Sequence, residues 1–336
     1  MDLGRPEERG RQTRGPLPGG PFSAISRRGF VGSAAAFTAG TPAFAAESFV
    51  QRHRLEIGIQ LYMLGPDVAG DLDGALAAVA AIGYRQVELA GFLGRDAASV
   101  RKSLDQAGLT CPSVHVQGRS AGGVDPSLED PGRLADALAA VGARVAVMPT
   151  PRIPPRLGLR PAPGEVRGAY LRRVLPQFAA EDWKANADFL NRTAATLAGH
   201  GIRVGYHNHN AEFAPIGDTT GFEILLAETD PRRITFELDA GWATAAGLDP
   251  GALLAQHPGR FSMMHVKDVK ASTRRNFVLQ QDPTEVGSGV IDWRRLLPLA
   301  HRAGVSHYFV EQEPPFERPR LASAQLSFDY LTRVPA

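Results

Sequence analysis

Val204-Gly205-Tyr206-His207-Asn208-His209 is a short apolar run that ends in side chains able to bind a metal. Three further runs of this kind follow along the chain, and they end at Asp239, His265 and Glu311. In a barrel of parallel strands, the carboxyl ends of all strands open onto one face. Four successive strands would therefore bring His207, Asp239, His265 and Glu311 together. A mixed set of imidazole and carboxylate groups suits a divalent metal.

Strand-like and helix-like segments alternate from residue 55 onward, which is typical of an α/β protein with a parallel sheet. Strands are predicted at Ile57–Tyr62, Tyr84–Leu89, Thr110–Val116, Arg144–Met148, Arg203–His207, Ile234–Leu238, Phe261–Val266 and His307–Glu311. Helices are predicted at 71–83, 97–107, 131–141, 181–200, 220–228, 250–256, 293–303 and 320–331. Eight such units predict a (β/α)8 TIM barrel that forms a single domain over residues 47–336. A doubly wound open sheet is the alternative, and it is weakened because no Gly-rich turn follows the first strand.

The first 46 residues do not have the pattern of a folded domain. Arg27-Arg28 precedes a short apolar stretch rich in small residues, and Ala43-Phe44-Ala45 fits a cleavage site. This order predicts a twin-arginine signal peptide with a disordered N-terminus over residues 1–46, and export to the periplasm by the twin-arginine route. A disordered basic arm is the alternative.

The overall charge is nearly balanced, with 37 Lys and Arg against 35 Asp and Glu. This balance argues against nucleic acid and against an anionic membrane surface as partners. No apolar stretch of the mature chain is long enough to span a membrane. Cys111 is the single cysteine, so no internal disulfide can form. The sequence leaves open whether the chain forms a homo-oligomer.

An insert rich in proline and arginine follows the fourth predicted strand, over residues 149–176. So many prolines exclude a regular helix or a central strand there. Its position predicts that it lies at the barrel mouth, either as a lid or as a surface loop without a role. The glycine-bearing loop over residues 267–289 is a second candidate lid.

Several stretches together resemble the xylose isomerase-like TIM barrels of the sugar phosphate isomerase/epimerase family. They are Gly58–Tyr62, Ala81–Leu89, Pro112–His115, Tyr206–His209 with Glu212-Phe213, Leu238–Trp242, His265–Asp268 and Val310-Glu311. In many members of this family, two Glu, one Asp and one His bind a divalent metal at the barrel mouth. By position, this resemblance makes Asp239, His265 and Glu311 metal ligands. The earlier Glu is replaced by His207, as in a subgroup with the Tyr-His-Asn-His sequence.

The resemblance implies an enzyme that acts on a small carbohydrate, and a metal that is Mn, Zn, Co, Fe or Mg. The expected reaction removes a proton next to the carbonyl of a keto-sugar, glycoside or cyclitol, with the metal as Lewis acid. The candidate acids and bases are Glu311, His209, Glu88 and Glu212, and the candidate substrate contacts are Tyr62, His115, Trp242 and Lys267. Structural roles remain open for several of them: a buried ion pair for Glu88, a pair with Asp268 for Lys267, and rim packing for the two aromatic residues.

His207 changes the expected chemistry. Two His and two carboxylates leave a divalent site neutral, which favours Mn, Fe, Co or Zn over Mg and polarises a ketone more strongly. The loss of one Glu weakens a two-base epimerisation relative to a one-base isomerisation or a β-elimination, for example from a 3-keto-glycoside. Export favours a neutral substrate over a phosphorylated one. The alternatives are a metal-dependent hydrolase of the endonuclease type and a non-catalytic sugar-binding barrel.

Overall fold

The computed structural model describes residues 47–119, 125–158 and 160–336. The predicted signal peptide, residues 1–46, lies outside the described residues. Within these ranges, none of the helices combines the length and the apolar character needed to cross a membrane.

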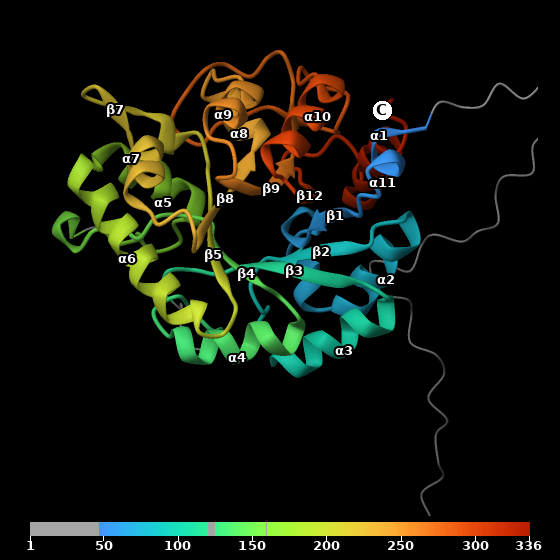
Figure 1. Ribbon diagram of the computed structural model, residues 1–336, viewed down its shortest axis with the longest axis horizontal. Coiled ribbons are helices and arrows are strands. Elements are labelled where there is room, and N and C mark those ends of the chain that lie inside the picture. Colours follow the sequence, from blue (N-terminus) through green and yellow to red (C-terminus); the bar gives the residue numbers. More distant parts are fainter. Residues whose placement is uncertain (1–46, 120–124, 159) are drawn as a thin grey trace, which may run out of the picture.

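Eight parallel strands close into a barrel, which confirms the predicted (β/α)8 architecture (Figure 1). The hydrogen-bonded order around the barrel is β1-β12-β9-β8-β5-β4-β3-β2, and β1 pairs with both β2 and β12. The barrel strands are β1 (Ile57–Gln60), β2 (Gln86–Leu89), β3 (Thr110–His115), β4 (Val145–Met148), β5 (Arg203–His207), β8 (Ile234–Asp239), β9 (Phe261–Val266) and β12 (His307–Val310).

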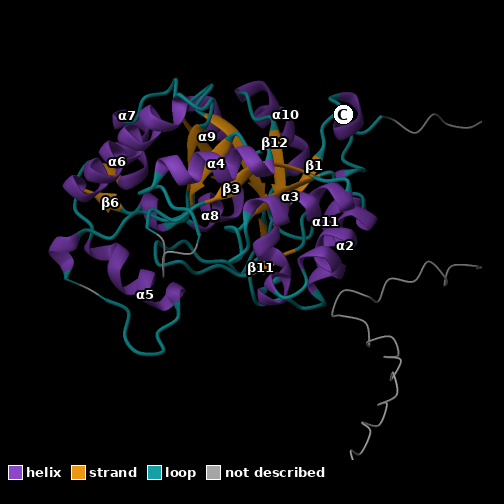
Figure 2. Ribbon diagram, turned by 90° about the horizontal axis from the view of Figure 1, so that it is seen from below, coloured by secondary structure: helices purple, strands orange, loops and turns teal. Residues whose placement is uncertain are grey.

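Helices surround the strands on the outside of the barrel (Figure 2). They include α2 (Leu72–Ile82), α3 (Ala97–Ala107), α4 (Pro131–Val141), α6 (Ala180–Ala198), α7 (Gly221–Glu228), α9 (Pro250–Gln256), α10 (Trp293–Ala303) and α11 (Arg320–Leu331). Three shorter helices are α1 (Phe49–Arg52), α5 (Arg167–Val174) and α8 (Ala240–Ala245). Two small antiparallel pairs are β6 (Pro215–Ile216) with β7 (Thr219–Thr220) and β10 (Asp268–Val269) with β11 (Pro283–Thr284).

Aspartate side chains fix where several of these helices begin. Asp71, Asp96, Asp130 and Asp292 each precede a helix and accept a hydrogen bond from a backbone N–H of its first turn. Such a cap satisfies one of the donors that a helix N-terminus leaves without a partner. These caps therefore help to define the first residue of each of the four helices.

A separate apolar layer fills the interior of the barrel. Val145, Val147, Met263 and Phe309 form a cluster of their own, distinct from the large core between strands and helices. Close packing requires Gly58 here, since a Cβ atom at that position would lie 2.4 Å from the Phe309 ring. The strand register places His265 beside Phe309, so polar side chains continue the interior where this apolar layer ends.

Two expectations for the chain connections are wrong in detail. Strand β1 ends at Gln60, because residues 61–64 turn into a 3-10 helix whose first turn donates to the Gln60 side chain. The insert over residues 149–176 does contain a regular helix, α5. Its prolines lie outside Arg167–Val174, so they leave two turns of chain in which a helix can form.

The Asp268 side chain anchors the long loop that follows β9. Its carboxylate is fully buried and accepts hydrogen bonds from the backbone N–H groups of Val269, Gly287, Gly289 and Ile291 and from the Trp293 indole. Side chains are excluded at Gly289, where a Cβ atom would lie 2.1 Å from Asp268 Oδ1. Gly287 and Gly289 thus allow the loop backbone to approach the Asp268 carboxylate within hydrogen-bond distance.

Replacing Asp268 by Asn tests whether these hydrogen bonds stabilise the loop. In either orientation of the introduced side-chain amide, its NH2 group would face two or three of the five N–H donors and could not accept their hydrogen bonds. We therefore expect the free energy of unfolding to fall by about 3 kcal/mol. Asp136→Asn, on the exposed face of α4, is the matched control and should change little. Urea unfolding followed by circular dichroism measures both, and equal stabilities would contradict the assigned role.

Candidate active site

Four neighbouring strands carry polar residues in pairs separated by two positions at their carboxyl ends. The pairs are His207 with His209, Glu237 with Asp239, His265 with Lys267, and Glu311 with Glu313. Within β8, Glu237 and Asp239 share one side because successive side chains of a strand alternate. In the other three pairs the second residue lies beyond the strand end, and contacts with neighbouring segments place it. The interior therefore holds two polar layers above its apolar layer.

The lower layer joins two carboxylates to three imidazoles. Glu237 Oε2 lies 2.9 Å from His115 Nε2, 3.0 Å from His207 Nδ1 and 3.1 Å from His265 Nε2. Glu88 Oε2 lies 2.8 Å from His265 Nε2 and 3.1 Å from His115 Nε2. One compact cluster from β2, β3, β5, β8 and β9 results.

Neutral side chains hold Glu88 in this cluster. Gln60 Nε2 donates to Glu88 Oε2 over 2.8 Å, and Ser113 Oγ donates to Glu88 Oε1 over 2.7 Å. All three residues are fully buried. Glu88 is therefore fixed from both adjacent strands, β1 and β3.

The upper layer surrounds the other face of His265. His265 Nδ1 lies 3.3 Å from Glu311 Oε2 and 3.7 Å from Asp239 Oδ2. Lys267, which is also fully buried, places its Nζ atom 2.6 Å from Glu311, 3.1 Å from Asp239 and 2.7 Å from Glu313. One ammonium group thus lies among three carboxylates.

The orientation of Asp239 is set by its neighbours. Its Oδ1 atom caps α8 by accepting a hydrogen bond from Trp242 N over 2.8 Å. Its backbone N–H donates to Asn208 Oδ1 over 3.1 Å. These contacts leave Asp239 Oδ2 buried in the site, where it faces the Lys267 ammonium and His265 but forms no hydrogen bond with the described residues.

The carboxylates control the protonation of the imidazoles. Burial acts to lower the pKa of His265, but the charges of Glu237 and Glu311 outweigh it, so the pKa lies well above its usual value. Burial likewise opposes the charges of Glu88 and Glu237 at His115, whose pKa rises to about 9. Burial and the charge of His265 hold the pKa of His207 well below its usual value. His207 is therefore neutral and able to offer a nitrogen lone pair.

The donor set fits a divalent metal. Glu88, Glu237, Asp239, Glu311 and Glu313 formally carry five negative charges, against one from Lys267 and two from protonated His265 and His115. Two groups of side chains bring candidate ligand atoms within 4.8 Å of one another, and they are His115, His207, Glu237 and His265, and Asp239, His265 and Glu311. Glu237 Oε1 is also buried without a hydrogen-bond partner in the described chain, and Asp239 Oδ2 has ion pairs with Lys267 and His265 but no hydrogen bond. A buried carboxylate oxygen without a hydrogen bond and an excess of negative charge are both features that a cation would satisfy.

The predicted metal ligands lie together. Asp239, His265 and Glu311 belong to one of these groups, and His207 Nε2 lies 4.0 Å from Asp239 Oδ2. His207 also belongs to the other group through Glu237, a residue that the sequence interpretation missed. The signal was present in the strand, because Glu237 stands two positions before Asp239 and shares its face. The same spacing identifies Glu313, two positions after Glu311.

A cavity of about 340 Å³ opens above the cluster. Its lining includes Tyr62, His115, His207, His209, Trp242, Glu311 and Glu313. The insert also contributes to the lining, with Pro149, Thr150, Arg167, Gly168, Leu171 and Arg172, and Leu279 contributes from the loop after β9. Both predicted lid segments therefore lie at the barrel mouth. The volume lies within the range of small-molecule sites, about 300–1,000 Å³.

The remaining predicted residues lie in different surroundings. Glu212 is fully buried, outside the lining of the cavity, and accepts hydrogen bonds from the Tyr206 hydroxyl (2.8 Å) and the His209 backbone N–H (3.0 Å). It supports the segment that carries His209. The His209 ring lies 5.5 Å from the Trp242 ring, at the cavity wall. Trp242 Nε1 donates to Glu313 Oε1 over 3.0 Å, which links this wall to the carboxylates.

Comparisons with known proteins agree with this architecture. A family model described as xylose isomerase-like TIM barrel matches residues 76–334. The sugar phosphate isomerase/epimerase of Parabacteroides distasonis ATCC 8503 has a similar fold, with a TM-score of 0.64 and 24% identity, over 82% of this chain and 97% of that one.

Two sequence relatives have curated names. The inosose dehydratase of Geobacillus thermodenitrificans is 31% identical over 157 residues, which cover 43% of this chain and 52% of that protein. The chain thus matches only about half the length of that dehydratase. The rhizopine catabolism protein MocC of Rhizobium meliloti is 27% identical over 287 residues, which cover 81% of this chain and 84% of that protein.

Removing the Lys267 ammonium tests the charge balance of the upper layer. Lys267→Met leaves Asp239, Glu311 and Glu313 without their shared cation, so we expect a loss of about 3–5 kcal/mol in unfolding free energy when chelator is present. Lys184→Met, which breaks an exposed pair with Glu181, is the control and should have little effect. Urea unfolding in EDTA measures both variants, and an equally small effect at Lys267 would contradict the role assigned to it.

Proposed function

The chain belongs to the xylose isomerase-like TIM barrel family, and we propose that it is a metal-dependent enzyme that removes a proton next to the carbonyl of a keto-sugar, a glycoside or a cyclitol. The named relatives support the substrate class, since an inosose dehydratase acts on a cyclitol ketone. The observation that carries the proposal is the buried cluster of imidazoles and carboxylates that opens into one cavity at the barrel mouth.

Four residues would hold the metal: His207, Asp239, His265 and Glu311. Three of them offer ligand atoms within 4.8 Å of one another, and the low pKa of His207 keeps its lone pair available. A divalent ion bound there would act as a Lewis acid on the carbonyl and a neighbouring hydroxyl. As a metal ligand His265 would have to be neutral, so it would give up the proton that its raised pKa otherwise retains.

Proton transfer requires a base that reaches the substrate. Glu311 and His209 both line the cavity, so they are the favoured candidates. Burial opposes ionisation of Glu311, but Lys267 and His265 lower its pKa, which keeps it ionised. Glu88 and Glu212 lie outside the cavity lining and engage both carboxylate oxygens in hydrogen bonds within the chain, which favours positioning roles.

The substrate contacts follow from the same lining. Tyr62, His115 and Trp242 line the cavity and would contact a sugar ring through aromatic faces and polar edges. Lys267 lies beneath the cavity, where it contacts Asp239, Glu311 and Glu313. It would affect the substrate through the position and charge of these three carboxylates.

The His207 replacement favours elimination over two-base epimerisation. One base removes the proton, and the C–H electron pair forms the new double bond as the bond from the next carbon to its oxygen breaks. The leaving oxygen then takes up a proton. Loss of water from a cyclitol ketone and loss of an aglycone from a 3-keto-glycoside share this scheme.

Proton exchange tests the proposed reaction most directly. In heavy water, the wild type with Mn, Co or Zn should incorporate deuterium next to the carbonyl of inosose or a 3-keto-glycoside, as read by mass spectrometry and, after metal removal, by NMR. Asp239→Asn and His265→Ala should each lower both the bound metal and the exchange rate by more than about 100-fold, since even residues that only support ligands are worth about 10–100-fold. His200→Ala, at the exposed end of α6, is the control.

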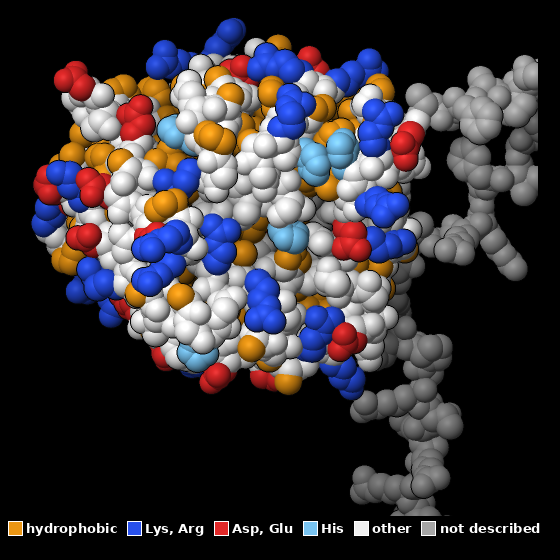
Figure 3. Space-filling view, viewed as in Figure 1, with side chains coloured by type: hydrophobic (Ala, Val, Ile, Leu, Met, Phe, Trp, Pro, Cys, Tyr) orange, Lys and Arg blue, Asp and Glu red, His pale blue; other side chains and the backbone are white. Residues whose placement is uncertain are grey.

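Other results would favour the alternative functions. Full exchange by metal-free enzyme would contradict the metal-dependent mechanism. Cleavage of DNA with Zn or Mn, without exchange on any ketone, would support the endonuclease-type hydrolase. The near balance of 37 Lys and Arg against 35 Asp and Glu argues against that function. On the one face drawn in Figure 3, basic side chains lie among neutral and acidic ones. Absence of both stoichiometric metal and exchange would support a non-catalytic sugar-binding barrel.

We also propose that the protein is exported to the periplasm through its twin-arginine sequence. Replacing Arg27 and Arg28 together by Lys should retain the precursor in the cytoplasm, as measured by cell fractionation and immunoblotting. The mature wild type should begin near Ala46 or Glu47 by N-terminal sequencing. Equal amounts of both forms in the periplasm would contradict this route.

A further inference from the structure

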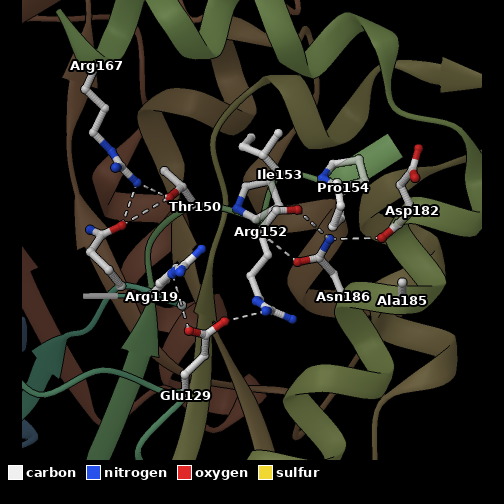
Figure 4. Close-up of a pocket in the computed structure, with 14 residues that line it drawn as sticks. Arg119, Glu129, Thr150, Arg152, Ile153, Pro154, Arg167, Asp182, Ala185 and Asn186 are labelled. Carbon is white, nitrogen blue, oxygen red and sulfur yellow. Dashed lines mark hydrogen bonds and ion pairs between the residues drawn. The ribbon is translucent and has the colours of Figure 1, made fainter. Parts of the chain in front are cut away.

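A second cavity lies beside the mouth cavity. Its volume is about 430 Å³, and Gln117, Thr150 and Arg167 line both cavities. It is bounded by the insert and by α6, which contributes Asp182 and Asn186 (Figure 4). A substrate bound over the metal ligands could therefore extend past Arg167 into this second space.

Most charged side chains around the second cavity have a partner of opposite charge. Arg152 contacts Glu129 at 2.5 Å, and Arg119 lies 3.8 Å from the same carboxylate. Asp182 pairs with Arg156. These groups satisfy one another without a ligand.

Arg167 is different. Its Nη2 atom donates to two neutral oxygens, Gln117 Oε1 and Thr150 Oγ1, each at 2.5 Å (Figure 4). No carboxylate of the described residues forms an ion pair with it. Burial lowers the pKa of Arg167, and Tyr170 opposes that effect only in part. Arg167 as a whole residue is exposed and lines both cavities, so a ligand can reach it.

This combination is typical of a recognition site for an oxyanion. A guanidinium presents five N–H donors in a planar fork, and a carboxylate or phosphate can accept two of them in parallel. Gln117 and Thr150 fix the direction of the fork and use only one of its nitrogen atoms. The other donors and the uncompensated positive charge remain available at the boundary between the two cavities.

We propose that Arg167 binds an oxyanion substituent of the substrate, a carboxylate or a phosphate, at the junction of the mouth cavity and the second cavity. This inference rests on the proposed function for the reacting part of the substrate. It narrows the substrate class to acidic sugar or cyclitol derivatives, and so replaces the neutral substrate that export alone would favour. The reacting carbonyl would lie over His207 and Glu311, and the anionic group would lie toward the insert.

Direct binding measurements test the proposal. D-Glucuronate provides the carboxylate, D-glucose 6-phosphate the phosphate, and D-glucose the neutral reference, each titrated by calorimetry into full-length enzyme at low salt. At least one anion should bind about tenfold or more tightly than glucose. Arg167→Gln should abolish that preference, since a charged hydrogen-bonded contact of this kind is worth about 10–100-fold.

Arg192→Gln is the matched control, because it removes the same charge from the exposed face of α6 and lies outside the lining of both cavities. It should change anion affinity by less than about threefold. Arg167→Lys should recover only part of the affinity, since an ammonium group cannot donate in a planar fork. Selectivity for glucuronate or for glucose 6-phosphate would each support the proposal and identify the oxyanion.

Three results would overturn it: no preference for either anion in the wild type, full preference in Arg167→Gln, or equal losses in Arg167→Gln and Arg192→Gln. Thermal unfolding of each variant excludes misfolding as the cause. Deuterium exchange separates this proposal from the proposed function. Exchange on a keto-sugar without anion preference defeats the Arg167 assignment alone, whereas anion preference without exchange defeats only the reaction.

Discussion

The confinement of five carboxylates at the carboxyl ends of the barrel strands is the constraint on which the rest of the site depends. His265 contacts four of them, Glu88 and Glu237 through Nε2 and Asp239 and Glu311 through Nδ1. Lys267 takes up the remaining one, Glu313, together with two that it shares with His265. Barrel closure brings these groups together because the strand register directs their side chains to the inside of the barrel. Their mutual repulsion is tolerable only because cationic side chains, and in our proposal a metal, lie between them.

Much of this arrangement follows from the sequence by simple rules. The eight strand–helix units predicted the barrel, and the positions of His207, Asp239, His265 and Glu311 at strand ends predicted that they would meet. Extending the two-residue alternation by one step also identifies Glu237 and Glu313. What local pattern cannot supply is the pairing between strands, such as Glu88 with His265, because 177 residues of chain separate the two. The α5 helix did not follow from the proline content of the whole insert, because the prolines lie outside the eight residues that form it.

The division of labour among the acidic residues is also a product of packing. Glu88, Glu212 and Glu311 are the same residue type. Glu88 and Glu212, however, accept hydrogen bonds from other side chains of the protein. Glu311 reaches the cavity and is kept charged by Lys267 and His265. A residue type at a strand end therefore predicts proximity to the site, while its hydrogen-bond partners decide whether it is free to act on a substrate.

The insert between β4 and α6 makes part of the cavity wall but contributes none of the candidate metal ligands. Figure 2 shows α5 protruding beside the barrel, so its sequence can vary without disturbing the strand register beneath. In our proposals, the groups that bind the distant part of a substrate and the groups that carry out the chemistry thus lie on separate segments of the chain. Such a separation makes the barrel evolvable, since exchange of one short segment can redirect an intact reaction centre toward new compounds.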